Sequence, residues 1–154
     1  ARPERSRAAP AGVIATRTPT DADRDAVVAI WEACGLTRPW NDPGADFLRA
    51  LGHDASTVIL AERDTRIIGT AMTGFDGHRG WIYYLGVAPD QQGQGIARQL
   101  LDASCEWLRL RGCPKVELML RDGNPAAGLY EHLGWKPQDV RVFARWLAGE
   151  DGHN

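Results

Sequence analysis

The stretch Leu85-Gly-Val-Ala-Pro-Asp-Gln-Gln-Gly-Gln-Gly-Ile-Ala97 decides the fold of this chain. It overlaps the end of an apolar run that begins at Trp81, and it leads into an amphipathic segment that continues to about Arg111. Gly93 and Gly95 let a backbone approach a bulky anion without interference from a Cβ atom. The N–H groups of such a loop and the positive end of the following helix can bind phosphate. The stretch therefore predicts a strand, an anion-binding turn and a helix in succession.

Glycine-rich turns before helices also occur for purely structural reasons, so the glycines alone do not specify a ligand. The turn lacks the Lys-Ser/Thr pair of a P-loop. Arg98 stands where the dinucleotide-binding fingerprint needs glycine or alanine. Neither nucleotide-binding motif is matched, and the choice between a structural turn and an anion site depends on the rest of the chain.

The composition predicts a single globular domain. Of the 154 residues, 44% are hydrophobic and 25% are charged, as is usual for a chain that buries a sizeable core. A net charge of −2 argues against a nucleic-acid binder that works through bulk charge. No apolar run is long enough to span a membrane. Residues 1–11 lack the apolar core of a signal peptide, so we expect a flexible extension there, a domain over 12–148, a flexible tail over 149–154 and a cytoplasmic location.

The three cysteines are Cys34, Cys105 and Cys113. Their number is odd and their spacing matches no metal-binding pattern. We therefore expect neither a disulfide framework nor a bound metal.

Hydrophobic periodicity and turn residues predict alternating strands and helices, with no repeat and no second domain. Tight turns should make the strands at 57–62, 67–74 and 81–87 antiparallel, whereas an intervening helix should make the strands at 81–87 and 115–120 parallel. Strands are expected over Val13–Thr18, Thr57–Glu62, Ile67–Gly74, Trp81–Val87, Lys115–Leu120 and Val140–Leu147, the last closing the sheet. Helices are expected from Asp21 or Asp23 through Trp31, over Ala45–Leu51, from Gly95 to Arg111 and within Asp122–Leu133.

Two blocks of this sequence resemble motifs of the GNAT family of N-acetyltransferases. Gln92, Gly95 and Ala97 match the family's Gln/Arg-x-x-Gly-x-Gly/Ala, and the strand before them carries its Leu-x-Val-x-Pro pattern. The stretch Asn124–Trp135 is similar to the family's Asn-x-x-Ala-x-x-Leu-Tyr-Glu-x-x-Gly-Phe, with a shift at 128–129. Stretches 36–43, 76–80, 83–87 and 111–115 further resemble the bacterial YpeA branch, so the resemblance covers roughly residues 13–147.

This resemblance implies an α/β (α+β) fold with a mixed, mostly antiparallel central sheet, helices on both faces and a splayed parallel strand pair. The pantetheine arm of acetyl-CoA would enter the gap like an extra strand and use free backbone groups. Gly86 suits a bulge that opens this edge. Leu85 and Val87 can also pack in the core, because side chain and backbone act separately. The residues implied to bind acetyl-CoA are Leu85, Val87, Gln92, Gly93, Gln94, Gly95, Ile96, Ala97, Arg98, Asn124 and Tyr130.

The resemblance also implies direct attack of an amine on acetyl-CoA through a tetrahedral intermediate. The Val87 N–H would stabilise the oxyanion. Tyr130 would act as the general acid toward the leaving thiolate. Packing of a helix onto the sheet is the commoner role for a tyrosine, but the flanking motif favours the catalytic role here. Asn124 would cap the short helix or bind the pantetheine amide.

The general base is left open by the sequence. Family members that acetylate ribosomal-protein N-termini carry a glutamate where this chain has Met119. For each remaining candidate a structural or solvated role is the commoner one. These candidates are Glu117, Tyr83, Tyr84, His78 and Asp42.

The loop Arg38–Asp42 and the turn Asp76–Arg79 are expected on the acceptor side. Arg38 would pair with an acceptor carboxylate. Asp42 would pair with the acceptor's ammonium group or with a water that relays its proton. Trp40 adds an aromatic surface, although an ordinary loop with Asn and Asp turns gives the same pattern. His78 and Tyr83 complete the candidate set, and we expect a small-molecule amine as acceptor.

Other functions fit the same motifs. The acceptor could be a protein N-terminus or a lysine side chain. A non-catalytic acyl-CoA sensor would keep the loop but need no acid, and Tyr130 argues against it. A structural interaction domain would leave two ordered motifs to coincidence. The sequence also allows a homodimer, and it predicts neither a nucleic-acid nor a membrane partner.

Overall fold

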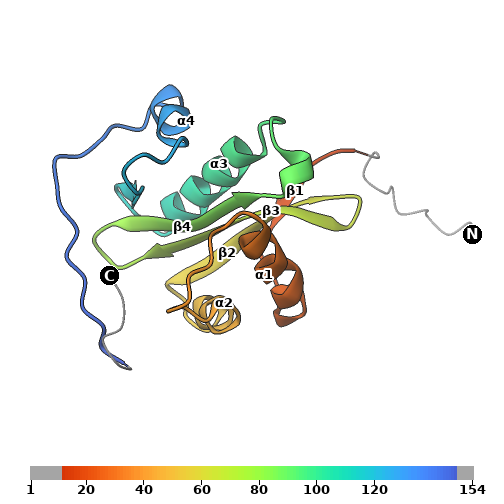
Figure 1. Cartoon of the computed structure of the whole chain (residues 1–154), viewed down its shortest axis with the longest axis horizontal. Helices are drawn as coiled ribbons and strands as arrows, with labels where there is room; N and C mark the ends of the chain where they lie inside the picture. Colours follow the sequence, from red (N-terminus) through yellow and green to blue (C-terminus); the bar gives the residue numbers. More distant parts are fainter. Residues whose placement is uncertain (1–11, 149–154) are drawn as a thin grey trace, which may run out of the picture.

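The computed structural model describes residues 12–148, and the flexible segments predicted at 1–11 and 149–154 lie outside them. A five-stranded sheet in the order β1-β2-β3-β4-β5 forms the middle layer (Figure 1). Neighbouring strands are antiparallel except for β4 and β5, which are parallel, so the predicted mixed sheet is confirmed. The strands are β1 Ala15–Arg17, β2 Ser56–Arg63, β3 Arg66–Phe75, β4 Gly80–Val87 and β5 Val116–Leu118.

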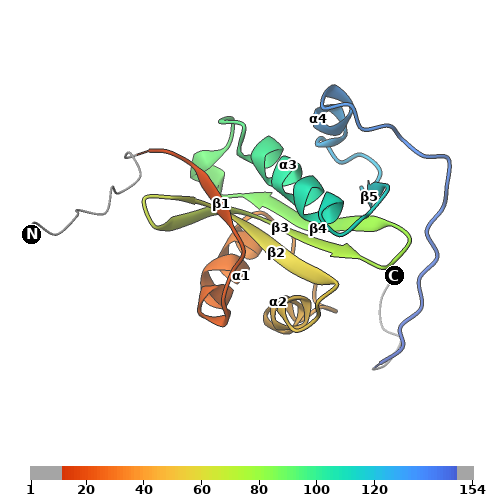
Figure 2. The same ribbon diagram turned by 180° about the vertical axis from the view of Figure 1, so that it is seen from behind.

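Helices cover both faces of the sheet, as expected. Helices α1 (Arg24–Ala33) and α2 (Pro43–Leu51) lie on one face, and α3 (Ile96–Arg109) lies on the other with α4 (Ala127–His132) beside it (Figures 1 and 2). Short 3-10 turns at Asp21–Asp23 and Pro89–Gln91 precede α1 and the glycine-rich loop. Within residues 12–148 no helix has the length and apolarity needed to cross a membrane.

Each face of the sheet has its own apolar core. Successive residues of a strand point to opposite faces, so β2 contributes to both cores. Its Val58 and Leu60 pack with α1 and α2, and its Ile59 and Ala61 pack with α3. All four side chains are buried.

Helix α3 approaches the sheet closely at two glycines. A Cβ atom on Gly69 would lie 2.9 Å from Leu100 Cδ1 and 3.1 Å from Ile96 Cγ2. A Cβ atom on Gly80 would lie 2.7 Å from Leu108 Cδ1. Because both ends of α3 rest on backbone that carries no side chain, the position of its N-terminus relative to β4 is fixed.

Strand β4 contains a bulge. The register with β3 shifts between Thr70 and Met72, so β4 has an extra residue there. Tyr84 lies at the bulge with a φ of +50°, a left-handed conformation that costs a non-glycine residue about 1–3 kcal/mol. The bulge predicted at Gly86 is thus centred on Tyr84, while Gly86 pairs with Thr70. The stacking of the Tyr84 ring on Trp31, at a centroid distance of 3.9 Å, offsets part of this strain.

Strands β4 and β5 separate along their length. They pair only at Gly80–Val116, Trp81–Glu117 and Ile82–Leu118. Within the described part of the chain, β5 has no pair for the stretch of β4 from Tyr83 to Val87. This is the splayed parallel pair that the family resemblance implies.

The strand predicted over Val140–Leu147 is wrong. Among the described residues, 136–148 contain no strand, and they run past the end of the sheet (Figure 2). Phe143 is 90% exposed and Leu147 is 95% exposed. A strand needs a partner edge, and β5 is only three residues long.

The contact between α3 and β3 gives a stability prediction. Gly69→Val should lower the free energy of unfolding by about 1–3 kcal/mol, because its side chain must displace Leu100 and Ile96. Urea unfolding of the two proteins measures this difference. Gly128→Ala in α4 is the control: no atom lies within 4 Å of the added Cβ, so stability should stay equal or rise. Equal stability of Gly69→Val and the wild type would contradict the close packing.

Candidate functional site

A cavity of about 1010 Å³ opens where β4 and β5 separate. The α1–α2 loop and α2 form one wall, and the segment from β5 to α4 forms the other. Met119, at the position where a peptide-type base is expected, also lines it. The cavity brings together six of the residues singled out from the sequence: Arg38, Trp40, Tyr83, Leu85, Asn124 and Tyr130.

Other candidates lie outside this cavity. The Asp42 carboxylate accepts a hydrogen bond from the Ala45 N–H at 3.1 Å and thereby caps α2. His78 lies in the β3–β4 turn, where its backbone N–H donates to Asp76. Glu117 lies between two cations, with its Oε1 3.7 Å from Arg79 Nε and 3.6 Å from Lys115 Nζ.

The predicted anion-binding turn ends at the first residue of α3. Gly93 has a φ of +80° and Gly95 a φ of +76°, conformations that favour glycine. A Cβ atom on either residue would meet no atom within 4 Å, so the loop faces open space. Since Gly95 is the N-cap of the 14-residue α3, the space lies at the positive end of a helix.

Side chains from outside the turn hold it in place. Arg63 at the end of β2 donates to the side-chain oxygens of Gln91 and Gln94. Arg66 forms two 2.9 Å hydrogen bonds with the Asp90 carboxylate, which lowers the pKa of that acid. Sequence reasoning missed both arginines, because nothing local in the β2–β3 hairpin indicates a partner 24 to 31 residues away.

One carbonyl group connects the end of β4 to the end of α1 and to the glycine-rich turn. The Val87 carbonyl oxygen accepts hydrogen bonds from the Cys34 thiol at 3.2 Å and from the Gln92 amide at 3.3 Å. Gln92 therefore links the turn to the strand. The Gln92 side chain binds the protein backbone. Leu85 lines the cavity.

Tyr130 lies at the opposite wall of the cavity. Its side chain is buried against Trp135, whose ring is 5.9 Å away edge-on. Within residues 12–148 its hydroxyl group has no hydrogen-bond partner, and burial raises the pKa of the phenol. The nearby Asn124 side chain accepts a hydrogen bond from the Ala126 N–H at 2.9 Å in the turn before α4, but the N-cap of α4 is Ala126, so Asn124 does not cap the helix as predicted. The phenol thus remains protonated at neutral pH and faces the cavity.

Tyr84 projects from the β4 bulge toward α2. Its hydroxyl group donates to Asp46 Oδ2 at 2.7 Å, and both residues line the cavity. Burial, and then this hydrogen bond, raise the pKa of Tyr84. Tyr84 is therefore a hydrogen-bond donor rather than a proton acceptor. Asp46 could not be predicted from the sequence, because its partner Tyr84 is 38 residues away and no motif surrounds Asp46.

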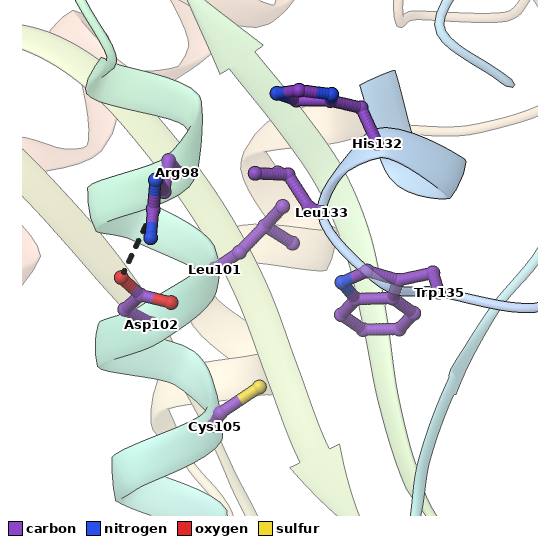
Figure 3. Close-up of a pocket in the computed structure, with 7 residues that line it drawn as sticks. All are labelled: Arg98, Leu101, Asp102, Cys105, His132, Leu133 and Trp135. Atoms are coloured by element: carbon purple, nitrogen blue, oxygen red, sulfur yellow. Dashed lines mark ion pairs between the residues drawn. The ribbon is translucent and has the colours of Figure 1, made fainter. Parts of the chain in front are cut away.

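A second, smaller pocket of about 200 Å³ lies between α3 and the α4 region (Figure 3). It contains the predicted cofactor residue Arg98, whose guanidinium Nε lies 3.9 Å from Asp102 Oδ2 on the same helix. Cys105 and His132 face it from opposite sides (Figure 3). Neither this pocket nor any other part of residues 12–148 holds three His, Cys, Asp or Glu side chains arranged for a metal.

Comparisons with known proteins agree with this architecture. An acetyltransferase of Pectobacterium atrosepticum is 48% identical over 126 residues, which are 81% of this chain and 89% of that protein. The solved aminoglycoside N-acetyltransferase AAC(6')-Iy, in complex with the bisubstrate analogue CoA-S-monomethyl-acetylneamine, superposes with a TM-score of 0.77 at 18% identity, covering 89% of this chain and 100% of that one. A predicted acetyltransferase of Clostridium acetobutylicum, solved with acetyl-CoA, gives a TM-score of 0.73 at 20% identity, covering 86% and 96%.

The two structural likenesses show a shared fold. Residues 24–135 match the model of the family described as Acetyltransferase (GNAT) family. With the identity to the Pectobacterium protein over most of both chains, this match shows that the chain belongs to the GNAT family of acetyltransferases.

Proposed function

We propose that this protein transfers the acetyl group of acetyl-CoA to a primary amine of a small molecule. The observation that carries the proposal is the single cavity that joins the unpaired edge of β4, Tyr130 and the α1–α2 wall. An acyl donor bound along β4 and an amine bound against the α1–α2 wall would meet inside it. Solved GNAT structures similar in fold contain CoA or acetyl-CoA, which supports the choice of donor.

Three parts of the donor can be assigned to features of this chain under the proposal. The open turn at Gly93 and Gly95, at the start of α3, suits the pyrophosphate. The backbone of β4 from Tyr83 to Val87 lacks pairing with β5 and suits the amide groups of pantetheine. The thioester would then lie between the end of β4 and Tyr130.

The reaction requires one bond to form and one to break. The amine nitrogen attacks the thioester carbonyl carbon, and the Val87 N–H stabilises the resulting oxyanion. When the carbon–sulfur bond breaks, the sulfur takes a proton from Tyr130, which burial keeps protonated. The proton lost by the amine passes to water, since Glu117 is paired with cations and Tyr84 is a donor.

Two observations favour a small acceptor over a protein N-terminus. Met119 lines the cavity at the position where a peptide-type base is expected. The α1–α2 wall also offers charged and aromatic side chains, Arg38 and Trp40, for a polar molecule.

A two-stage experiment tests the proposal. Calorimetry measures acetyl-CoA binding, and thiol release then reports turnover on amino acids, polyamines, aminoglycosides and N-terminal peptides. We expect binding, and turnover on a small amine. Binding without any turnover would favour an acyl-CoA sensor, and efficient turnover on peptides alone would favour a protein acetyltransferase.

The turn gives the first functional prediction. Gly95→Glu should abolish measurable CoA binding by calorimetry, because it places a carboxylate where the pyrophosphate is expected. Gly95→Ala is the matched control: it carries the same strain at a φ of +76° but no charge, so it should weaken binding much less. If a folded Gly95→Glu protein bound CoA as tightly as the wild type, the anion site would lie elsewhere.

Tyr130 gives a prediction about chemistry. Tyr130→Phe should lower kcat by roughly 10²- to 10⁴-fold, the span for one positioned general acid, while the Kd for acetyl-CoA stays the same. The ring and its contact with Trp135 are retained, so the fold should be unaffected. Steady-state thiol release, with chemistry shown to limit the rate, measures the effect. An unchanged kcat would assign Tyr130 to packing alone.

Trp40 gives a prediction about the acceptor. Trp40→Ala should raise the acceptor KM and leave the Kd for acetyl-CoA unchanged, because Trp40 lines the cavity on the α1–α2 side. Initial rates at varied acceptor concentration, together with calorimetry, separate the two effects. A loss of CoA affinity with an unchanged acceptor KM would place Trp40 on the donor side instead.

A further inference from the structure

Asp46 is the only acidic side chain among the described residues that line the cavity. It lies in the first turn of α2, and its side chain is 21% exposed. The other charged lining residues include Arg38, Arg49 and Arg121. A single carboxylate among several cations marks one position on this wall where a positive group of a ligand would be favoured.

Two protein groups donate hydrogen bonds to the Asp46 carboxylate. The Tyr84 hydroxyl group donates to Oδ2 at 2.7 Å, and Arg49 Nη1 donates to Oδ1 at 2.9 Å. A carboxylate accepts about four hydrogen bonds, so Asp46 keeps capacity for a ligand while Tyr84 orients it.

The chain maintains a strained residue to place the Tyr84 hydroxyl group there. Tyr84 adopts a φ of +50° at the bulge, and its ring stacks on Trp31 with an interplanar angle of 12°. The Thr70 hydroxyl donates to the Tyr84 carbonyl at 3.1 Å, and the buried Trp31 indole N–H donates to Thr70 at 2.8 Å. Strain that several buried contacts maintain at a cavity wall indicates a role beyond packing.

We propose that Asp46, oriented by Tyr84, binds an ammonium group of the acceptor, so that the acceptor is a cationic amine. This assignment rests on the proposed function and specifies its substrate class. The ammonium group donates to the Asp46 carboxylate inside the cavity. Arg49 is 64% exposed and competes for the same carboxylate, so the incoming cation partly displaces a weak surface ion pair.

The closing experiment uses the amine with the highest kcat/KM in the thiol-release panel and compares Asp46→Asn with the wild type. Loss of one charge-assisted hydrogen bond should raise the acceptor KM about 10- to 100-fold. The Kd for acetyl-CoA and the melting temperature should change little. Asp25→Asn is the matched control, because Asp25 also lies in the first turn of a helix but is 91% exposed and outside the cavity.

Arg49→Gln keeps the test decisive if Asp46→Asn fails to fold. Removing the competing cation should lower the acceptor KM, whereas a purely structural Asp46–Arg49 pair predicts no change or a rise. Tyr84→Phe should raise the acceptor KM less than Asp46→Asn does, because it removes only the orienting hydrogen bond.

Three outcomes overturn the assignment. An unchanged acceptor KM in folded Asp46→Asn, with active wild-type enzyme, refutes it and leaves the proposed function standing. If Asp42→Asn raises the acceptor KM and Asp46→Asn does not, the ammonium site lies at the α2 cap instead. Absence of transfer by the wild type to every amine of the panel overturns the proposed function and this assignment together.

Discussion

The separation of β4 from β5 after Ile82 is the constraint on which the rest of the site depends. A strand inside a sheet normally uses its backbone groups on both sides. Here the crossover through α3 places β5 beside β4, but the two strands pair at only three positions among the described residues. The remaining backbone of β4 is thus available to a ligand, and the cavity follows from that opening.

The bulge at Tyr84 and this separation are parts of one arrangement. An extra residue bends β4, turns the Tyr84 ring toward Trp31 of α1 and its hydroxyl toward Asp46 of α2. The two helices on that face therefore hold the strand from one side while α3 holds it from the other. The geometry of the site is set by contacts between elements far apart in the sequence, and the turn at Gly93 and Gly95 combines local glycine conformations with distant contacts from Arg63 and Arg66.

This division explains what the sequence could and could not predict. The succession of strand, turn and helix and the parallel pair follow from short-range patterns and from crossover rules, whereas the helices on both faces follow from the family resemblance. The position of the bulge depends on Trp31, 53 residues before Tyr84, and Asp46 has no motif around it. Val140–Leu147 fails as a predicted strand for a related reason, since the residues of one segment say nothing about the sheet edge available to it.

Because α3 packs directly on Gly69 and Gly80, changes in the core also affect the turn at the start of α3. The helix begins at the turn and rests directly on sheet backbone, so any side chain added beneath it would move the turn as well. If the turn binds the anion as proposed, selection for tight packing and selection for anion affinity act on the same few positions. A substitution in this interface would then change both the abundance of the protein in the cell and the degree to which the protein is saturated with its substrate.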